Sequence, residues 1–259
     1  MALKVYTRDQ DNENEFEIYK QLSRPSQHPG RGHVRNALDV FTLPRPGGDH
    51  QCLVQNPLWE SLYDLHFIMP DGRMDETILK SALKQVLLAL DYLHTECKLV
   101  HTGTSHCKAI IIPRLHSLIT WKDIKPDNIM QELNDNSVLE NFVQAELEKP
   151  SPRKVVNGNT VYLSRLFEPP KKFGRALLCD FGSSVQGEEQ QHHNAQPEIF
   201  RSPEVMLMAD WSYPIDIWNV GVMVSIAEFQ LDSLILTRLE TRPGSCSRVT
   251  SCSRANTLP

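Results

Sequence analysis

The strongest folding signal in this sequence is a helical pattern of apolar residues between Asp75 and His94. Apolar side chains recur at helical spacing and form one broad face: Ile78, Leu79, Ala82, Leu83, Val86, Leu87, Leu90 and Leu93. Asp75 stands where its carboxylate can cap the first turn. The chain has 259 residues, of which 40% are apolar, so it is long enough to bury such a face in a core. We therefore predict a buried helix over 75–94.

Shorter elements are expected ahead of this helix. Residues 2–6 (ALKVY) form an apolar run typical of a buried strand, and residues 12–22 carry apolar side chains at helical spacing. Strand-like runs follow at 40–43 and 52–54, between segments rich in Pro and Gly. Together these patterns predict a small lobe that contains a sheet.

Charge and cysteine content argue against several kinds of partner, disulfides and a zinc site. The net charge of −5 gives no support for nucleic acid or an acidic membrane surface as a partner. The six cysteines form no C-x-x-C pair, which favours reduced thiols over disulfides or a zinc site: Cys52, Cys97, Cys107, Cys179, Cys246 and Cys252. His106 with Cys107, or His192 with His193, could ligate a metal, but no second pair stands at zinc spacing, so solvated loop residues are favoured.

No targeting or membrane segment is expected. The first residues, MALKVYTRDQDNENE, lack the apolar stretch of a signal peptide. Polar residues interrupt the apolar run from Ile217 to Leu236, among them Glu228 and Asp232, which excludes a membrane span there. The sequence thus predicts a protein of the cytoplasm, the nucleus or both.

The segment Asp123-Ile124-Lys125-Pro126-Asp127-Asn128 carries groups suited to phosphoryl transfer. That reaction requires metal ions held by oxygen ligands, a cation on the phosphates and a carboxylate at the incoming hydroxyl. Asp123 and Asn128 have the spacing of a D-x-x-x-x-N catalytic loop, in which Asp receives the hydroxyl and Asn holds a metal. Lys125 supplies a positive charge for the transferred group.

Two further motifs agree with that chemistry. Asp180-Phe181-Gly182 follows an apolar strand-like run, so the carboxylate can face Mg²⁺ at a strand end. The motif is weak alone but strong because it comes after the Asp123 segment. Ala2-Leu3-Lys4-Val5 matches a strand in which Lys4 contacts ATP phosphates and pairs with a helix carboxylate. We expect that carboxylate to be Glu15, with Glu17 as the alternative.

The motifs, taken in order, resemble protein kinases and in particular the SR-protein-kinase-like Ser/Thr kinases of filamentous fungi. The resemblance is carried by LVHT, DIKPDNIM, LLCDFGSSV, IFRSPEVML and WSYPIDIWNVG. It implies a bilobal α+β fold, with ATP and Mg²⁺ as cofactors and protein substrates, among them Arg-Ser-rich proteins. It also implies nucleotide-binding positions at Asn56 and Leu58, an Asp216 that anchors the catalytic loop, and a monomer.

The resemblance also sets the expected domain boundaries. Residues 1–58 would be a partial small lobe, from the lysine strand to the hinge, and 59–238 a partial, mainly helical large lobe. Residues 131–176 would be an excursion loop with one helix and one short strand, the strand at 160–163. Residues 239–259 read as a disordered tail.

The sequence departs from the kinase pattern in two ways. Residues 103–122 separate His101 and Thr102 from Asp123, as an unspliced intron would, and a genuine loop is the alternative. No Gly-rich strand pair precedes Lys4, and the resemblance is lost from Ser225 onward. We therefore expect a truncated kinase with weak activity; a kinase-like binding module without catalysis is the alternative.

Overall fold

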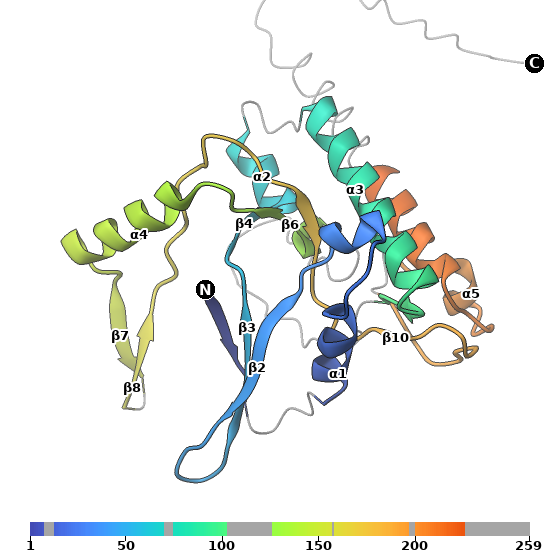
Figure 1. Ribbon diagram of the computed structural model, residues 1–259, viewed down its shortest axis with the longest axis horizontal. Coiled ribbons are helices and arrows are strands. Elements are labelled where there is room, and N and C mark those ends of the chain that lie inside the picture. The colour runs from blue at the N-terminus through green and yellow to red at the C-terminus, as the bar shows by residue number, and fades with distance from the viewer. Residues whose placement is uncertain (8–12, 70–74, 103–125, 157, 197–199, 226–259) are drawn as a thin grey trace, which may run out of the picture. The chain divides into compact units, whose positions relative to one another are not determined.

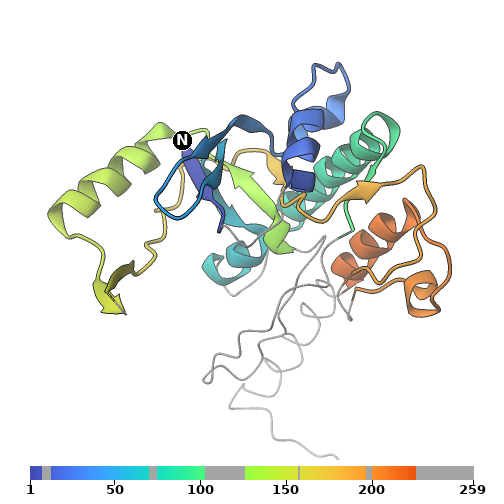
Figure 2. The ribbon, with the colours of Figure 1, turned by 90° about the horizontal axis from the view of Figure 1, so that it is seen from below.

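The structure is a computed structural model that describes residues 1–7, 13–69, 75–102, 126–156, 158–196 and 200–225. The chain divides into two compact units, residues 1–223 and 224–259, and residues 224 and 225 are the described part of the second. The first unit contains helices and small antiparallel sheets (Figures 1 and 2). This content confirms the predicted α+β class.

A three-stranded antiparallel sheet carries the first predicted motif. Its strands are β1 (Ala2–Val5), β2 (Ala37–Leu43) and β3 (His50–Gln55), in the order β1-β3-β2. The central strand is the buried one, with Cys52 and Leu53 fully buried. The predicted strands at 40–43 and 52–54 are confirmed within these longer bounds.

The prediction that residues 2–6 form a buried strand is wrong for most of its length. Leu3 and Val5 are 56% and 49% exposed, and Tyr6 alone in this run is buried. Within the described residues β1 pairs only with β3, so it lies at an edge of the sheet. An apolar run does not distinguish an edge strand from a central one, because both can contain the same side chains.

Two helices lie where the sequence predicts them. α1 runs from Glu13 to Leu22, and α3 runs from Glu76 to Thr95. Asp75 caps α3 by accepting hydrogen bonds from the N–H groups of Thr77 and Ile78, at 2.8 and 3.3 Å. The buried face of α3 is narrower than predicted, since Leu87 is 45% exposed.

A second sheet joins segments that are distant in sequence. Its strands are β4 (Leu58–Ser61), β6 (Ile129–Glu132) and β9 (Ala176–Leu178), in the order β4-β6-β9. α2 (Leu62–Ile68) follows β4 directly, capped by the Ser61 side chain. The 3-10 turn η3 (Pro126–Asn128) leads into β6. Because β4 pairs with β6, the predicted lobe boundary at residue 58 falls at the first residue of a paired strand.

Short elements complete the first unit. β5 (Leu99–Val100) pairs with β10 (Val185–Gln186), and the 3-10 turn η1 (Pro29–His33) packs on α3. A short helix, α5 (Pro203–Met206), is followed by a helix that begins at residue 214 and reaches residue 225. Among the described residues no helix is long and apolar enough to cross a membrane.

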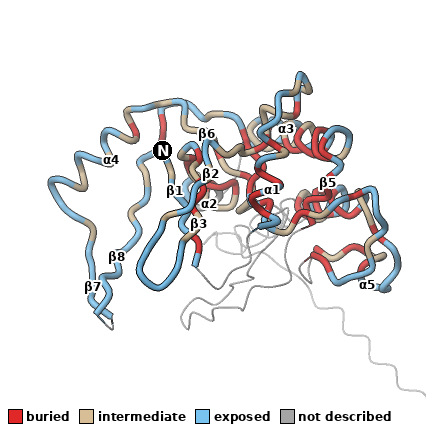
Figure 3. Tube along the Cα trace, turned by 60° about the horizontal axis from the view of Figure 1, so that its bottom comes forward, coloured by how far each residue is buried: buried red, intermediate tan, exposed pale blue. Residues whose placement is uncertain are grey.

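The excursion contains more structure than the sequence predicts. It holds α4 (Asn136–Glu148) and a two-stranded hairpin of β7 (Arg153–Val156) and β8 (Asn159–Tyr162). The predicted strand at 160–163 corresponds to β8, and its partner β7 was missed. Gln131 and Ala176 pair across β6 and β9, so the first and last residues of the 131–176 segment belong to the second sheet. Figure 3 shows that the hairpin is exposed along its length.

Candidate functional site

Lys4 and Glu15 form an ion pair between β1 and α1. Lys4 Nζ lies 2.9 Å from Glu15 Oε1, and the Glu15 side chain is 8% exposed whereas that of Lys4 is 49% exposed. Glu17, the alternative considered from the sequence, is 69% exposed and pairs with Lys20. Glu15 is therefore the helix carboxylate that reaches Lys4. Their contact with ATP stays a prediction.

Phe181 anchors the Asp180-Phe181-Gly182 turn in the core. Its ring is fully buried and makes edge contacts with Tyr19 and His101, at centroid distances of 5.8 and 5.2 Å. Asp180 adopts a φ of +68°, which is uncommon for a residue with a side chain. Because Phe181 holds the turn from inside, the Asp180 side chain is left exposed for a ligand.

The same turn lies beside the ion pair. A Cβ atom at Gly182 would lie 3.2 Å from Glu15 Oε2 and 3.8 Å from Asp180 Oδ1. Gly182 thus separates two carboxylates, with the ammonium of Lys4 bound to the first of them. Such a cluster of one cation and two carboxylates at a strand end suits a phosphate ester that binds with a divalent cation.

Asn128 lies next to the Asp180 turn. Ile129 pairs with Leu178 across the β6–β9 ladder, and the carbonyl of Asn128 accepts a hydrogen bond from Cys179 N at 2.8 Å. Asn128 immediately precedes β6, and Asp180 follows β9. Because the two strands are antiparallel, both residues lie at the same end of the pair. An amide oxygen and a carboxylate are hard oxygen donors, the ligand type that Mg²⁺ prefers. The other two predicted catalytic residues, Asp123 and Lys125, lie outside the described residues.

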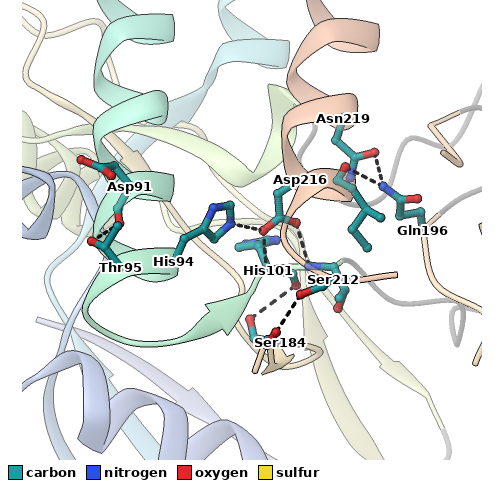
Figure 4. Close-up of polar contacts among 12 residues, drawn as sticks. Asp91, His94, Thr95, His101, Ser184, Gln196, Ser212, Asp216 and Asn219 are labelled. Atoms are coloured by element: carbon teal, nitrogen blue, oxygen red, sulfur yellow. Dashed lines mark hydrogen bonds and ion pairs between the residues drawn. The ribbon is translucent and has the colours of Figure 1, made fainter. Parts of the chain in front are cut away.

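Asp216 connects the main chain at His101 and Thr102 to the helix that begins at residue 214. Its carboxylate is fully buried and accepts hydrogen bonds from His101 N at 2.8 Å and Thr102 N at 3.2 Å. His94, on α3, places Nε2 2.9 Å from Oδ2 of the same carboxylate. Figure 4 shows Asp216 between these two histidines. Asp216 thus holds the His101–Thr102 main chain, its anchoring of the catalytic loop itself stays a prediction, and His94 is a partner that the sequence did not indicate.

Asn56 and Leu58, the predicted hinge positions, differ in their surroundings. Leu58 opens β4 and is buried in a cluster with Leu177 and Cys179. The connection at Asn56 is exposed, and its carbonyl accepts a hydrogen bond from the Arg35 guanidinium at 3.1 Å. Nucleotide contact at these two positions stays a prediction.

Arg35 is a positioning residue that the sequence did not reveal. Its main-chain N–H donates to the Leu178 carbonyl at 2.9 Å, while its side chain reaches Asn56. It therefore links the connection after β3 to the strand that precedes Asp180. Burial raises the pKa of the neighbouring Cys179 thiol to about 12, and the Arg35 charge opposes that effect.

Gln196 is a second residue that the motifs missed. It is fully buried, and its amide nitrogen donates to Asn219 Oδ1 at 2.7 Å and to the Ile215 carbonyl at 2.9 Å. Its amide oxygen accepts from Ser202 N at 2.9 Å. Gln196 thus joins the Ser202-Pro203-Glu204 segment to the helix that carries Asp216 (Figure 4).

The histidine pairs do not form a metal centre in the described part of the chain. His192 Nδ1 lies 2.8 Å from Asp210 Oδ1 at the surface, and His193 packs on the Trp211 ring. No group of three or more potential metal-binding His, Cys, Asp and Glu side chains occurs among the described residues. His106 and Cys107 lie outside them.

Comparison with known proteins agrees with this arrangement. No family model matches the chain. A serine/threonine protein kinase of Aspergillus fumigatus is 35% identical over 228 residues, which cover 86% of this chain and 50% of the relative. The serine/threonine-protein kinase SRPK of Physarum polycephalum is 26% identical over 192 residues, or 74% of this chain and 44% of the relative. A probable serine/threonine-protein kinase, sky1, of Dictyostelium discoideum is 32% identical over 136 residues, or 51% of this chain and 17% of the relative.

These relatives and the ordered motifs identify the class. The chain belongs to the protein kinase superfamily, and its relatives are serine/threonine kinases that include the SRPK type. The chain spans about half the length of the Aspergillus and Physarum kinases that it matches.

Proposed function

We propose that this chain is a protein serine/threonine kinase, which transfers the γ-phosphoryl group of ATP to a hydroxyl of a protein substrate. The observation that carries the proposal is the Lys4–Glu15 ion pair next to the Asp180 turn. Kinase catalysis requires a strand lysine paired with a helix glutamate and a carboxylate on the metal, both in place together. The names of the relatives support the same reaction.

The proposed roles follow from the chemistry of each group. Lys4 binds the α- and β-phosphates, and Glu15 fixes its ammonium. Asn128 and Asp180 would hold Mg²⁺, which neutralises charge on the phosphates when bound. Asp123 orients the substrate hydroxyl and receives its proton, and Lys125 binds the transferred group. The base would bind at the connection between exposed Asn56 and buried Leu58.

For the substrate we propose proteins rich in Arg and Ser. One support is the SRPK name of the Physarum relative. The other is the net charge of −5, which favours association with a cationic peptide over an acidic one. Neither observation identifies an individual substrate protein.

The test uses the full 259-residue chain. We expect ADP with Mg²⁺ to raise its melting temperature and labelled ATP to phosphorylate an Arg-Ser peptide, because bound ligand stabilises the folded state. Asp180→Asn removes the proposed metal ligand. We expect this variant to lose both the increase in melting temperature with ADP and Mg²⁺ and the phosphorylation of the peptide. Asp39→Asn is the control, since Asp39 is exposed on β2 and its carboxylate accepts a hydrogen bond from the N–H of its neighbour Val40.

Three results would distinguish an active kinase from a kinase-like binding module and from a chain that binds no nucleotide. Equal transfer by the wild type and Asp180→Asn would remove Asp180 from the metal site. Nucleotide binding without transfer in the wild type would favour the kinase-like binding module. An absence of any nucleotide binding would contradict the proposed function as a whole.

A further inference from the structure

The Tyr6 ring lies against the Lys4 ammonium of the ion pair. The residue follows β1, and Lys4 Nζ lies 4.4 Å from the centroid of the Tyr6 ring. Tyr6 is 4% exposed, and its ring makes an edge contact with Phe16 on α1, with centroids 5.2 Å apart. The Lys4 ammonium therefore has two protein contacts, a carboxylate and an aromatic face.

The main chain holds Tyr6 firmly in this place. Its N–H donates to the Gln51 carbonyl at 3.0 Å, and its own carbonyl lies 2.8 Å from His50 Nδ1. Both partners belong to β3, the buried central strand of the sheet. Tyr6 is thus bonded to the same central strand that pairs with Lys4.

The Tyr6 hydroxyl is buried. Its Oη has no hydrogen-bond partner of good geometry among the described residues. Burial, and then the charge of Glu15, raise the pKa of Tyr6 well above its ordinary value of 10, and Asp180 acts in the same direction. The hydroxyl therefore stays protonated.

We propose that Tyr6 is a positioning residue for phosphate binding, whose ring restrains the Lys4 ammonium where the nucleotide phosphates bind. The inference rests on the proposed function and adds a residue to it. A half-exposed ion pair contributes little by itself, because two flexible side chains must be ordered in high dielectric. An aromatic face beneath the ammonium adds attraction and removes alternative positions of the lysine. A pre-positioned cation loses less entropy when phosphate binds.

The experiment compares ligands that differ only in phosphate. Binding of ADP and of adenosine to the full chain is measured by calorimetry in the presence of Mg²⁺, for the wild type, Tyr6→Phe and Tyr6→Leu. Loss of a cation–π contact corresponds to roughly twofold to thirtyfold in affinity. We expect Tyr6→Leu to weaken ADP binding by that factor and to leave adenosine binding unchanged. Tyr6→Phe keeps the ring and is expected to bind ADP nearly as the wild type does.

A double variant tests whether Tyr6 acts through Lys4. Lys4→Met removes the ammonium, so adding Tyr6→Leu to it is expected to weaken ADP binding no further. If melting curves show that Tyr6→Leu is unfolded, Tyr6→Met fills a similar volume without an aromatic face and takes its place.

The outcomes separate this inference from the proposed function. Equal losses for ADP and adenosine in Tyr6→Leu would mean that Tyr6 serves the fold alone, and additive losses in the double variant would mean that it does not act on Lys4. Either result overturns the inference and leaves the proposed function standing. A wild-type chain that binds neither ligand overturns both.

Discussion

Replacement of Asp216 tests whether one buried carboxylate fixes the segment before the catalytic loop. Asp216 is fully buried, and so is His101, while Thr102 is 3% exposed. Two variants give a graded perturbation. Asp216→Ala removes both acceptor oxygens, and Asp216→Asn replaces one of them with an N–H donor of the same size.

The expected magnitude follows from the bonds that each variant loses. Oδ2 accepts from His101 N and His94 Nε2, and Oδ1 accepts from Thr102 N. An unsatisfied buried donor costs about 1–3 kcal/mol. Asn can keep its oxygen at the Oδ2 position and lose only the Thr102 bond, so we expect a loss of about 1–3 kcal/mol in the free energy of unfolding. Ala strands both main-chain donors, for which we expect roughly 2–6 kcal/mol.

The assay is urea unfolding of the full chain, monitored by tryptophan fluorescence and by circular dichroism. Asp210→Asn is the matched control, because Asp210 is also an aspartate near this helix but is 55% exposed and pairs with His192 at the surface. We expect it to unfold at the wild-type urea concentration. The reasoning is refuted if Asp216→Ala unfolds at the same urea concentration as Asp210→Asn, or if Asn is as damaging as Ala.

Three further predictions concern other parts of the first unit. The Arg175 guanidinium holds the pKa of Glu132 below its ordinary value of 4.5. The pair therefore stabilises the fold above pH 4.5, and this stabilisation is lost as the pH falls through the folded-state pKa. Thermal unfolding of Glu132→Gln should show a flatter stability–pH curve in that range. Burial raises the pKa of Cys179 to about 12, so iodoacetamide at pH 8 should alkylate Cys179 only after urea unfolding, as read by mass spectrometry. Arg35→Met removes the bond to the Asn56 carbonyl, and urea unfolding should show a loss of about 1 kcal/mol.

The sequence predicted elements whose signals are local. The helix over 75–94 and its Asp75 cap needed only spacing and a capping side chain, and both are present. The choice of Glu15 over Glu17 also held for the ion pair, because the apolar positions around them define which face of α1 is buried. The kinase resemblance was readable because its motifs combine unusual residues in a fixed order.

Contacts between distant segments were not predictable in the same way. Arg35 reaches Asn56 and Leu178 only because the strands bring them together, and Tyr6 looked like one apolar residue in a strand. Gln196 is a polar residue in a polar stretch, and nothing local indicates that it is buried. The hairpin partner β7 was missed because RKVV carries no alternation of apolar and polar residues.

The residues that would do the chemistry and those that position them have opposite burial. Asp180 is exposed, yet its place is set by Phe181, which is fully buried against Tyr19 and His101. His101 in turn donates its N–H to buried Asp216, and its Nε2 lies 3.0 Å from the Cys179 carbonyl just before Asp180. Each buried contact fixes the next, so a displacement at Asp216 would reach the Asp180 carboxylate without touching it. Since phosphoryl transfer depends chiefly on positioning, such a buried series is as necessary to a kinase as the exposed carboxylate that it holds.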